Sequence, residues 1–161
     1  MPNRKPVAKS LCVLLVALVL AAPLLRAQIE RLTPDQIELV NKKWPGAKKT
    51  STGIRYIIQK EGDGESPKQG DTVGVCYIGT LLDGKKFDEH LDRDQPLAFR
   101  VGRGEVIPGW DQILPAMKLH EKRLVIIPSD LAYGSRGRAP DIPRDAVLVF
   151  EMELISIKHP E

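Results

Sequence analysis

Residues 97–117 read LAFRVGRGEVIPGWDQILPAM, and they contain three local structure signals in a row. Residues 97–101 form a short apolar run that ends at Gly102-Arg103-Gly104, where the two glycines favour a turn. Pro108-Gly109 then starts a helix, because proline fits the first helical position. Apolar residues follow at the i, i+3, i+4, i+7 spacing of one buried helix face: Trp110, Ile113, Leu114 and Met117. This stretch predicts a strand, a tight turn and one short amphipathic helix.

The sequence on both sides of this helix predicts strands. Turn residues separate further strand-like runs at 54–59, 72–82, 123–127 and 146–157, while residues 129–144 form an irregular loop. The last run alternates apolar and acidic residues in LVFEMEL, which is typical of an antiparallel strand with one face on a core and one in water. Several strands and one central helix predict an α+β domain, a sheet packed on a single helix.

The first 27 residues have the composition of a secretory signal peptide. Arg4, Lys5 and Lys9 precede residues 11–25, which carry no charge. A basic start, an apolar stretch of about 7–15 residues and a small residue at the cut are features of such a leader, so we expect cleavage after Ala27. The alternative is an uncleaved membrane anchor, for which the apolar run is shorter than the roughly 20 residues that a spanning helix needs. We expect an exported protein, periplasmic or secreted, that meets the membrane only during export.

Loss of the leader changes the charge of the chain. The full sequence carries 24 Lys and Arg and 21 Asp and Glu, a formal charge of +3. Removing residues 1–27 takes away four of these bases and no acid, which leaves 20 bases, 21 acids and a net charge of −1. No basic field then extends over the domain to attract nucleic acid. Cys12 leaves as well, and Cys76, inside the apolar run VCYIG, is expected to be a buried, unreactive thiol.

A second, shorter helix is expected after the leader. Thr33 can cap its start, Pro34 occupies the first helical position and Gln36 completes a capping box. Pro45-Gly46 ends it. Its narrow apolar stripe consists of Ile37, Val40 and Trp44.

The predicted organisation has four parts. A leader at 1–27 is followed by a helical arm and linker at 28–51, the main domain at 52–157 and a tail at 158–161. Residues 48–52 are interpreted as a solvated linker. The alternative is a basic patch for anionic lipid or a partner surface, formed around Trp44 by Lys42, Lys43, Lys48 and Lys49.

The common sets of catalytic and metal-binding residues do not occur in the sequence. The three histidines have no metal-ligand spacing to one another or to Cys76. Gly102-Arg103-Gly104 lacks the last glycine of a dinucleotide-binding fingerprint, and no serine lies in a nucleophile elbow. The sequence therefore predicts no metal and no cofactor.

Six blocks of the sequence are similar to those of one known family. In chain order they are YIGTL (77–81), DGKKFD (83–88), PLAF (96–99), GRGEVIPGW (102–110), LAYG (131–134) and LVFEMEL (148–154). Through these blocks, residues from about 52 to 157 resemble an FKBP-type peptidyl-prolyl cis-trans isomerase. The whole chain then resembles a single-domain, exported member of that family. The resemblance implies a twisted antiparallel sheet wrapped around one short helix. That fold agrees with the strands and helix expected from periodicity.

The resemblance also implies an apolar pocket for a proline side chain. The residues it assigns to catalysis are Tyr133, Asp88, Phe87 and Ile107. The residues it assigns to substrate binding are Tyr77, Phe99, Val106, Trp110, Ile142, Phe150 and Leu97. Trp110 is expected beneath the proline ring, while the Ile107 amide and the Tyr133 hydroxyl are expected to bind carbonyl groups of the ligand.

Catalysis of Xaa-Pro rotation without a covalent step is the function that the resemblance implies. The partners it implies are proline-containing polypeptides, chiefly exported proteins during folding, and macrolide inhibitors. We also expect a monomer, and the near-neutral charge of the mature chain predicts no binding of nucleic acid. The alternatives are a non-catalytic proline-peptide-binding module or holdase chaperone, and a scaffold that dimerises through residues 28–51.

Three features depart from the family pattern or leave a choice open. Leu97 stands where a well-known member has an aromatic residue. The segment 136–143 is more charged than expected, so Arg138 and Asp141 are expected to narrow the peptide preference or to weaken macrolide binding. Asp88 has the alternative roles of a turn residue or an ion-pair partner of Arg93.

Overall fold

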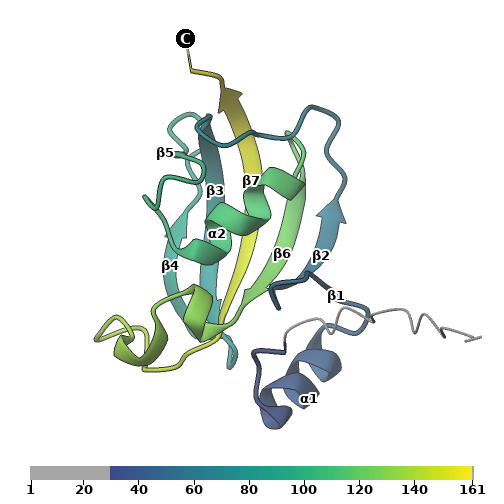
Figure 1. Cartoon of the computed structure of the whole chain (residues 1–161), viewed down its shortest axis with the longest axis vertical. Coiled ribbons are helices and arrows are strands. Elements are labelled where there is room, and N and C mark those ends of the chain that lie inside the picture. The colour runs from purple at the N-terminus through teal and green to yellow at the C-terminus, as the bar shows by residue number, and fades with distance from the viewer. Residues whose placement is uncertain (1–29, 161) are drawn as a thin grey trace, which may run out of the picture.

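A seven-stranded antiparallel sheet forms the centre of the protein (Figure 1). The computed structural model describes residues 30–160, so the predicted leader at 1–27 lies outside the described residues. The strands are β1 (Lys48–Lys49), β2 (Arg55–Lys60), β3 (Thr72–Leu81), β4 (Lys86–His90), β5 (Leu97–Arg100), β6 (Lys122–Ile127) and β7 (Leu148–Lys158). They pair in the order β1-β2-β6-β7-β3, and β4 and β5 both pair with β3.

The two longest strands, β3 and β7, form the middle of the sheet. They pair along their whole length, from Thr72 opposite Lys158 to Leu81 opposite Leu148. In β7 the side chains of Leu148, Phe150, Met152 and Leu154 are buried in the main core, while Glu151 and Glu153 remain half-buried. The predicted alternation is therefore confirmed, except that Val149 on the outer face is buried in a second apolar cluster instead of facing water.

Helix α2 (Pro108–Ile113) lies across the face of the sheet that carries the main core (Figure 1). Its backbone approaches β6 closely, since a Cβ atom on Gly109 would lie 2.5 Å from Ile127 Cγ2. The helix is shorter than the apolar stripe suggests, because Leu114–Ala116 continues as a 3₁₀ turn, η1. Pro115 lacks the amide hydrogen that another α-helical turn would use. The predicted α+β fold, a sheet around one short central helix, is confirmed.

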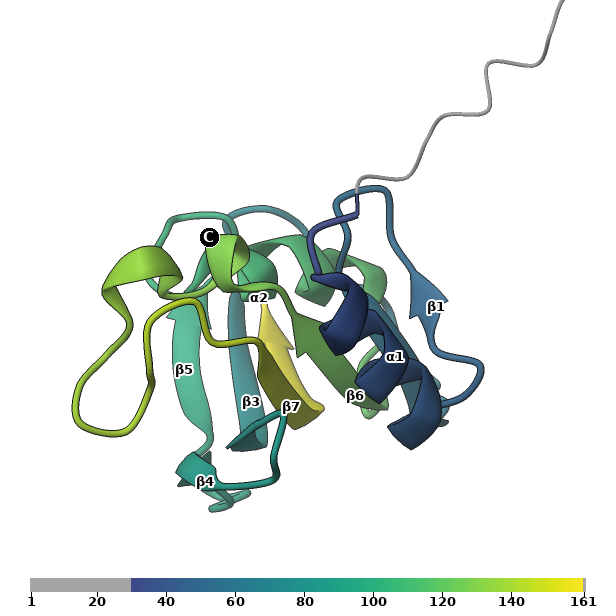
Figure 2. The ribbon, with the colours of Figure 1, turned by 90° about the horizontal axis from the view of Figure 1, so that it is seen from below.

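Helix α1 (Pro34–Lys43) packs on the opposite face of the sheet, beside β6 and β1 (Figure 2). The predicted capping box is present, with Gln36 N donating to Thr33 Oγ1 at 3.3 Å and Thr33 N donating to Gln36 Oε1 at 3.0 Å. A second apolar cluster joins this segment to the sheet. Its buried members are Leu32, Val40, Leu124, Ile126, Val147 and Val149.

Two short strands lie in segments without a strand-like sequence pattern. The predicted linker contains β1, in which Lys48 pairs with Tyr56 and Lys49 with Arg55. The turn at Gly53, which has a φ of 91°, brings the two strands together. The other unexpected strand, β4, has the mostly polar sequence KFDEH and covers one edge of β3. Edge strands of this kind lack the apolar alternation that marks a half-buried strand.

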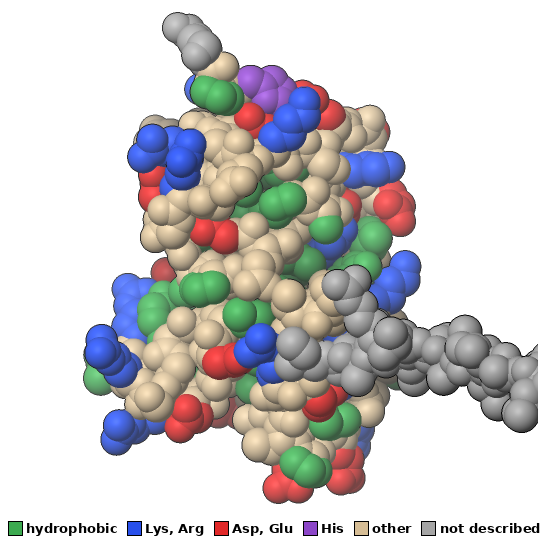
Figure 3. All heavy atoms as spheres, in the orientation of Figure 1, with side chains coloured by type: hydrophobic (Ala, Val, Ile, Leu, Met, Phe, Trp, Pro, Cys, Tyr) green, Lys and Arg blue, Asp and Glu red, His purple; other side chains and the backbone are tan. Residues whose placement is uncertain are grey.

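On the face drawn in Figure 3, Lys and Arg side chains are interspersed with Asp and Glu side chains. Cys76 is buried, its Sγ lies 3.4 Å from the Asp92 carbonyl oxygen, and burial raises the pKa of its thiol. None of the helices within residues 30–160 has the length and apolar character to span a membrane.

Candidate active site

A cavity of about 190 Å³ opens between α2, the sheet and the loop that joins β6 to β7. Its lining residues are Tyr77, Phe87, Asp88, Leu97, Glu105, Val106, Ile107, Trp110, Tyr133, Arg138 and Phe150. Nine of the eleven predicted site residues are in this set. The other two, Phe99 and Ile142, are buried in the main core and do not line the cavity.

Trp110 forms the floor of the cavity. Its side chain is 3% exposed, and its ring meets Tyr77 and Phe150 edge to face at centroid distances of 4.9 and 5.2 Å. Phe99 supports it with its ring centroid 5.7 Å away. Edge-to-face contacts match the positive ring edge to the negative face and so fix the ring orientations. The indole Nε1 has no hydrogen-bond acceptor among residues 30–160.

Phe87 forms one wall of the cavity and depends on a glycine beneath it. Its ring lies perpendicular to that of Phe150, with a centroid distance of 5.7 Å. A Cβ atom on Gly79 would lie 2.7 Å from Phe87 Cζ, closer than real contacts allow, and 3.0 Å from Phe150 Cε1, which is a tight contact. Gly79 thus lets both rings rest on β3. Sequence analysis assigned Gly79 no role, although a glycine inside a strand often marks a close approach.

Asp88 lies in the wall as a hydrogen-bond acceptor. Tyr77 Oη donates to Asp88 Oδ2 at 2.9 Å, and the Glu89 amide donates to Asp88 Oδ1 at 3.0 Å. Burial, together with this bond to a carboxylate, raises the pKa of Tyr77. The alternative that Asp88 pairs with Arg93 is wrong. Arg93 Nη1 pairs instead with Glu153 Oε2 at 2.6 Å, across the face of β7.

Two charged residues lie at the rim of the cavity. Arg138 Nη1 donates to Tyr133 Oη at 3.4 Å, and this bond raises the pKa of the guanidinium. Glu105 accepts hydrogen bonds from the Arg100 amide at 2.9 Å and from Arg100 Nε at 2.8 Å, which lower its pKa. Glu105 was not among the site residues predicted from the sequence. The signal available for it was an acid directly before the apolar pair Val106-Ile107 in a turn between a strand and a helix.

The Ile107 amide is a donor at the start of α2. Ile107 is the N-cap residue, with φ of −60° and ψ of 146°, and its amide has no acceptor among residues 30–160. Early amides of a helix have no partner within the helix itself. The cavity therefore combines an aromatic floor, an acceptor at Asp88, a hydroxyl at Tyr133 and a backbone donor at Ile107. Such a set suits a small apolar ring flanked by carbonyl groups.

Comparison with known proteins identifies the family. The sequence profile described as "FKBP-type peptidyl-prolyl cis-trans isomerase" matches residues 63–155, which is more than half of the chain. The chain belongs to this family. The predicted resemblance is therefore confirmed.

Two of the most similar FKBP-type relatives differ in size. The isomerase FkpA of Escherichia coli K12 is 47% identical over 116 residues, which cover 72% of this chain and 42% of FkpA. FK506-binding protein 1A of Neurospora crassa is 48% identical over 107 residues, which cover 66% of this chain and 89% of that protein. The chain thus spans less than half the length of the FkpA relatives and most of the length of the fungal one.

Solved structures agree with the FKBP-type fold. The crystal structure of Escherichia coli FkpA matches with a TM-score of 0.68 and 44% identity, over 77% of this chain and 58% of that chain. A peptidyl-prolyl cis-trans isomerase of Pseudomonas syringae matches with a TM-score of 0.68 and 36% identity, over 78% of this chain and 92% of that chain.

Proposed function

We propose that this FKBP-type protein is an active peptidyl-prolyl cis-trans isomerase whose substrate proline binds in the aromatic cavity over Trp110. The observation that carries the proposal is the composition of the cavity. Apolar rings surround its floor, and donors at Ile107 and Tyr133 lie on its margin. This arrangement supports catalysis by binding alone, with no covalent step.

The chemistry of an Xaa-Pro bond explains why such a cavity is sufficient. Amide resonance opposes rotation with a barrier of about 18–20 kcal/mol. The two isomers differ by only about 0.5–1 kcal/mol, yet they exchange in tens to hundreds of seconds. The twisted amide has lost resonance and charge separation, so an apolar cavity binds it better than it binds the planar form. Stronger binding of the transition state than of the ground state accelerates the reaction.

Each side chain has a role in this proposal. The proline ring packs on Trp110, and the wall residues Phe87 and Phe150 exclude water from it. The Ile107 amide and the Tyr133 hydroxyl hold carbonyl groups of the peptide out of the amide plane, which orients the twisted bond. Asp88 is the polar acceptor in the wall.

The substrates are proline-containing polypeptides, and the half-buried aliphatic side chains of Leu97 and Val106 favour an apolar residue such as Leu before the proline. Arg138 adds a positive charge at the rim beside Tyr133, and this charge narrows the range of peptide sequences that the cavity accepts. The protein is proposed to act as a monomer. FK506, for which the Neurospora relative is named, is proposed to compete for the same cavity.

The test is a coupled isomerisation assay on the mature chain, residues 28–161, with a short Leu-Pro peptide. We expect the rate of cis-to-trans exchange to rise in proportion to protein concentration, and FK506 to abolish the increase. A rate equal to the uncatalysed one, measured on folded protein that still binds the peptide, would identify a non-catalytic binding module instead.

Export is proposed from the composition of residues 1–27, with residues 28–51 as an arm and 52–157 as the isomerase domain. The client proteins are then exported proteins that fold outside the cytoplasm. N-terminal sequencing of protein recovered from the exported fraction is expected to begin near Gln28. Recovery of the full-length chain in the membrane fraction would contradict cleavage.

A further inference from the structure

The loop between β6 and β7, residues 128–147, carries two side chains of the cavity, Tyr133 and Arg138. Residues 30–44, which we call the brace, contact this loop near both of its ends. The brace comprises the residues that lead into α1, the helix itself and Trp44. It lies outside the six blocks that carry the family resemblance.

Arg31 joins the brace to the beginning of the loop. Its Nε donates to the Thr52 carbonyl oxygen at 2.7 Å, and its Nη1 forms an ion pair with Asp130 Oδ2. Asp130 belongs to the 3₁₀ turn η2 (Ser129–Leu131), so the ion pair holds the backbone three residues before Tyr133. The Arg31 side chain is 27% exposed, which lets it carry its charge beside Asp130 while its stem is covered.

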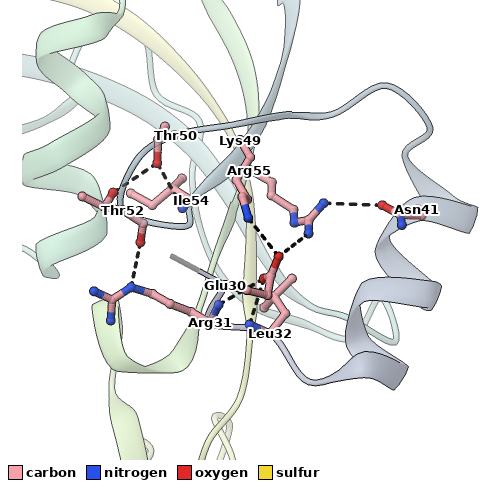
Figure 4. A network of polar contacts seen from close by, with 9 residues as sticks. All are labelled: Glu30, Arg31, Leu32, Asn41, Lys49, Thr50, Thr52, Ile54 and Arg55. Atoms are coloured by element: carbon pink, nitrogen blue, oxygen red, sulfur yellow. Dashed lines mark hydrogen bonds and ion pairs between the residues drawn. The ribbon is translucent and has the colours of Figure 1, made fainter. Parts of the chain in front are cut away.

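Arg31 is itself held in place by a polar network (Figure 4). Glu30 Oε1 accepts hydrogen bonds from the amides of Arg31 and Leu32, both at 3.1 Å. Glu30 Oε2 pairs with Lys49 Nζ at 3.1 Å and with Arg55 Nη2 at 2.9 Å. Although burial opposes the charged form, the Leu32 amide and the two bases lower the pKa of Glu30. The backbone at Arg31 is thus tied to β1 and β2.

The brace also contacts the other end of the loop. Leu32 and Val40 pack with Val147, the last loop residue, and with Val149 in β7. The two ends of the loop therefore both contact the brace, through an ion pair at one end and apolar packing at the other.

We propose that Arg31 is a positioning residue for Tyr133. By fixing Asp130 to the brace, it holds the start of the β6–β7 loop so that the Tyr133 hydroxyl remains at the cavity. The inference rests on the proposed isomerase function. A partly exposed ion pair contributes up to about a fivefold shift in the equilibrium between the held and the released loop.

Amide hydrogen exchange and kinetics on the whole mature chain test the inference together. In Arg31→Met and, separately, Asp130→Asn, we expect exchange of the amides at 131–137 to become about three- to fivefold faster, while exchange in β7 stays unchanged. The kcat/KM for the Leu-Pro peptide should fall by about the same factor. Lys122→Met is the matched control, because it removes another partly exposed ion pair, with Glu151 Oε2 at 3.2 Å, outside the brace and the loop.

A charge exchange distinguishes positioning from loss of stability. Arg31→Asp combined with Asp130→Arg is expected to restore slow exchange at 131–137 and most of the kcat/KM. Three results would each overturn the inference. The loop exchange rates could match those of Lys122→Met, exchange could become faster throughout β7, or the loop could exchange faster while the protein keeps full activity. An inactive wild-type protein would instead refute the proposed function, and the exchange data would still report on the ion pair.

Discussion

Replacing Phe87 by Ala is expected to lower kcat/KM for a Leu-Pro peptide at least tenfold, which corresponds to about 1.4 kcal/mol of lost transition-state binding. The Phe87 ring forms a wall of the cavity at 90° to Phe150, so its removal admits water beside the bound proline. Water stabilises the polar planar amide, so the cavity then favours the twisted amide less strongly. The coupled isomerisation assay, with the uncatalysed rate subtracted, measures the loss.

The controls for Phe87→Ala separate chemistry from folding. Phe87 is only partly buried, so the variant should keep a cooperative thermal transition and an unchanged circular dichroism spectrum. Phe87→Leu, which retains an apolar wall, should lose less activity than Phe87→Ala. Tyr133→Ala is expected to lower kcat/KM as well, through loss of the hydroxyl donor. Full activity in both alanine variants would show that the proline binds elsewhere.

Replacing Arg123 by Met is expected to reduce the free energy of unfolding by about 3–5 kcal/mol, because it leaves the buried carboxylate of Glu121 without its cationic partner. Arg123 and Glu121 are 3% and 2% exposed and form an ion pair. Arg123 Nη2 also donates to the Ala116 carbonyl oxygen at 3.0 Å, and its Cζ lies 4.5 Å from the Tyr56 ring centroid. Urea denaturation followed by fluorescence measures the change in midpoint at constant m-value.

Arg93→Met is the matched control for the buried pair. Arg93 also pairs with a glutamate, but its side chain is 58% exposed, so its loss should cost less than about 1 kcal/mol. In a second comparison, Arg123→Met combined with Glu121→Leu should recover part of the stability, because no unpaired charge then remains in the core. Equal losses in the Arg123 and Arg93 variants would contradict this account.

Periodicity in the sequence was sufficient to predict the central strands and both helices. The alternation in residues 148–154 and the stripe from Trp110 to Met117 each encode one buried face. In both segments the spacing of apolar residues along the chain is enough to indicate the strand or the helix. The edges of the sheet were harder to predict. Lys48–Lys49 and Lys86–His90 form strands because a neighbouring strand offers free backbone groups, and such pairing leaves no apolar pattern in either segment.

The site was predicted only through the resemblance to a family. Phe87, Trp110 and Tyr133 have no local feature that marks them as neighbours, since the closing of the sheet around α2 brings them together. Contacts between distant segments were equally hidden. The apolar stripe of α1 indicated a helix with a buried face. It did not indicate that this helix packs on the outer face of the sheet. The ion pair between Arg31 and Asp130 depends on that packing.

The place of β7 in the sheet has a consequence for synthesis. It is the last strand of the described chain, yet it lies between β6 and β3 and joins the two halves of the sheet. A nascent chain that still lacks residues 148–158 cannot complete its core, because neither half has its central partner. Folding of the domain must therefore wait until residues 148–158 have been synthesised. If residues 1–27 direct export as proposed, the core of the domain is still incomplete when the leader is recognised.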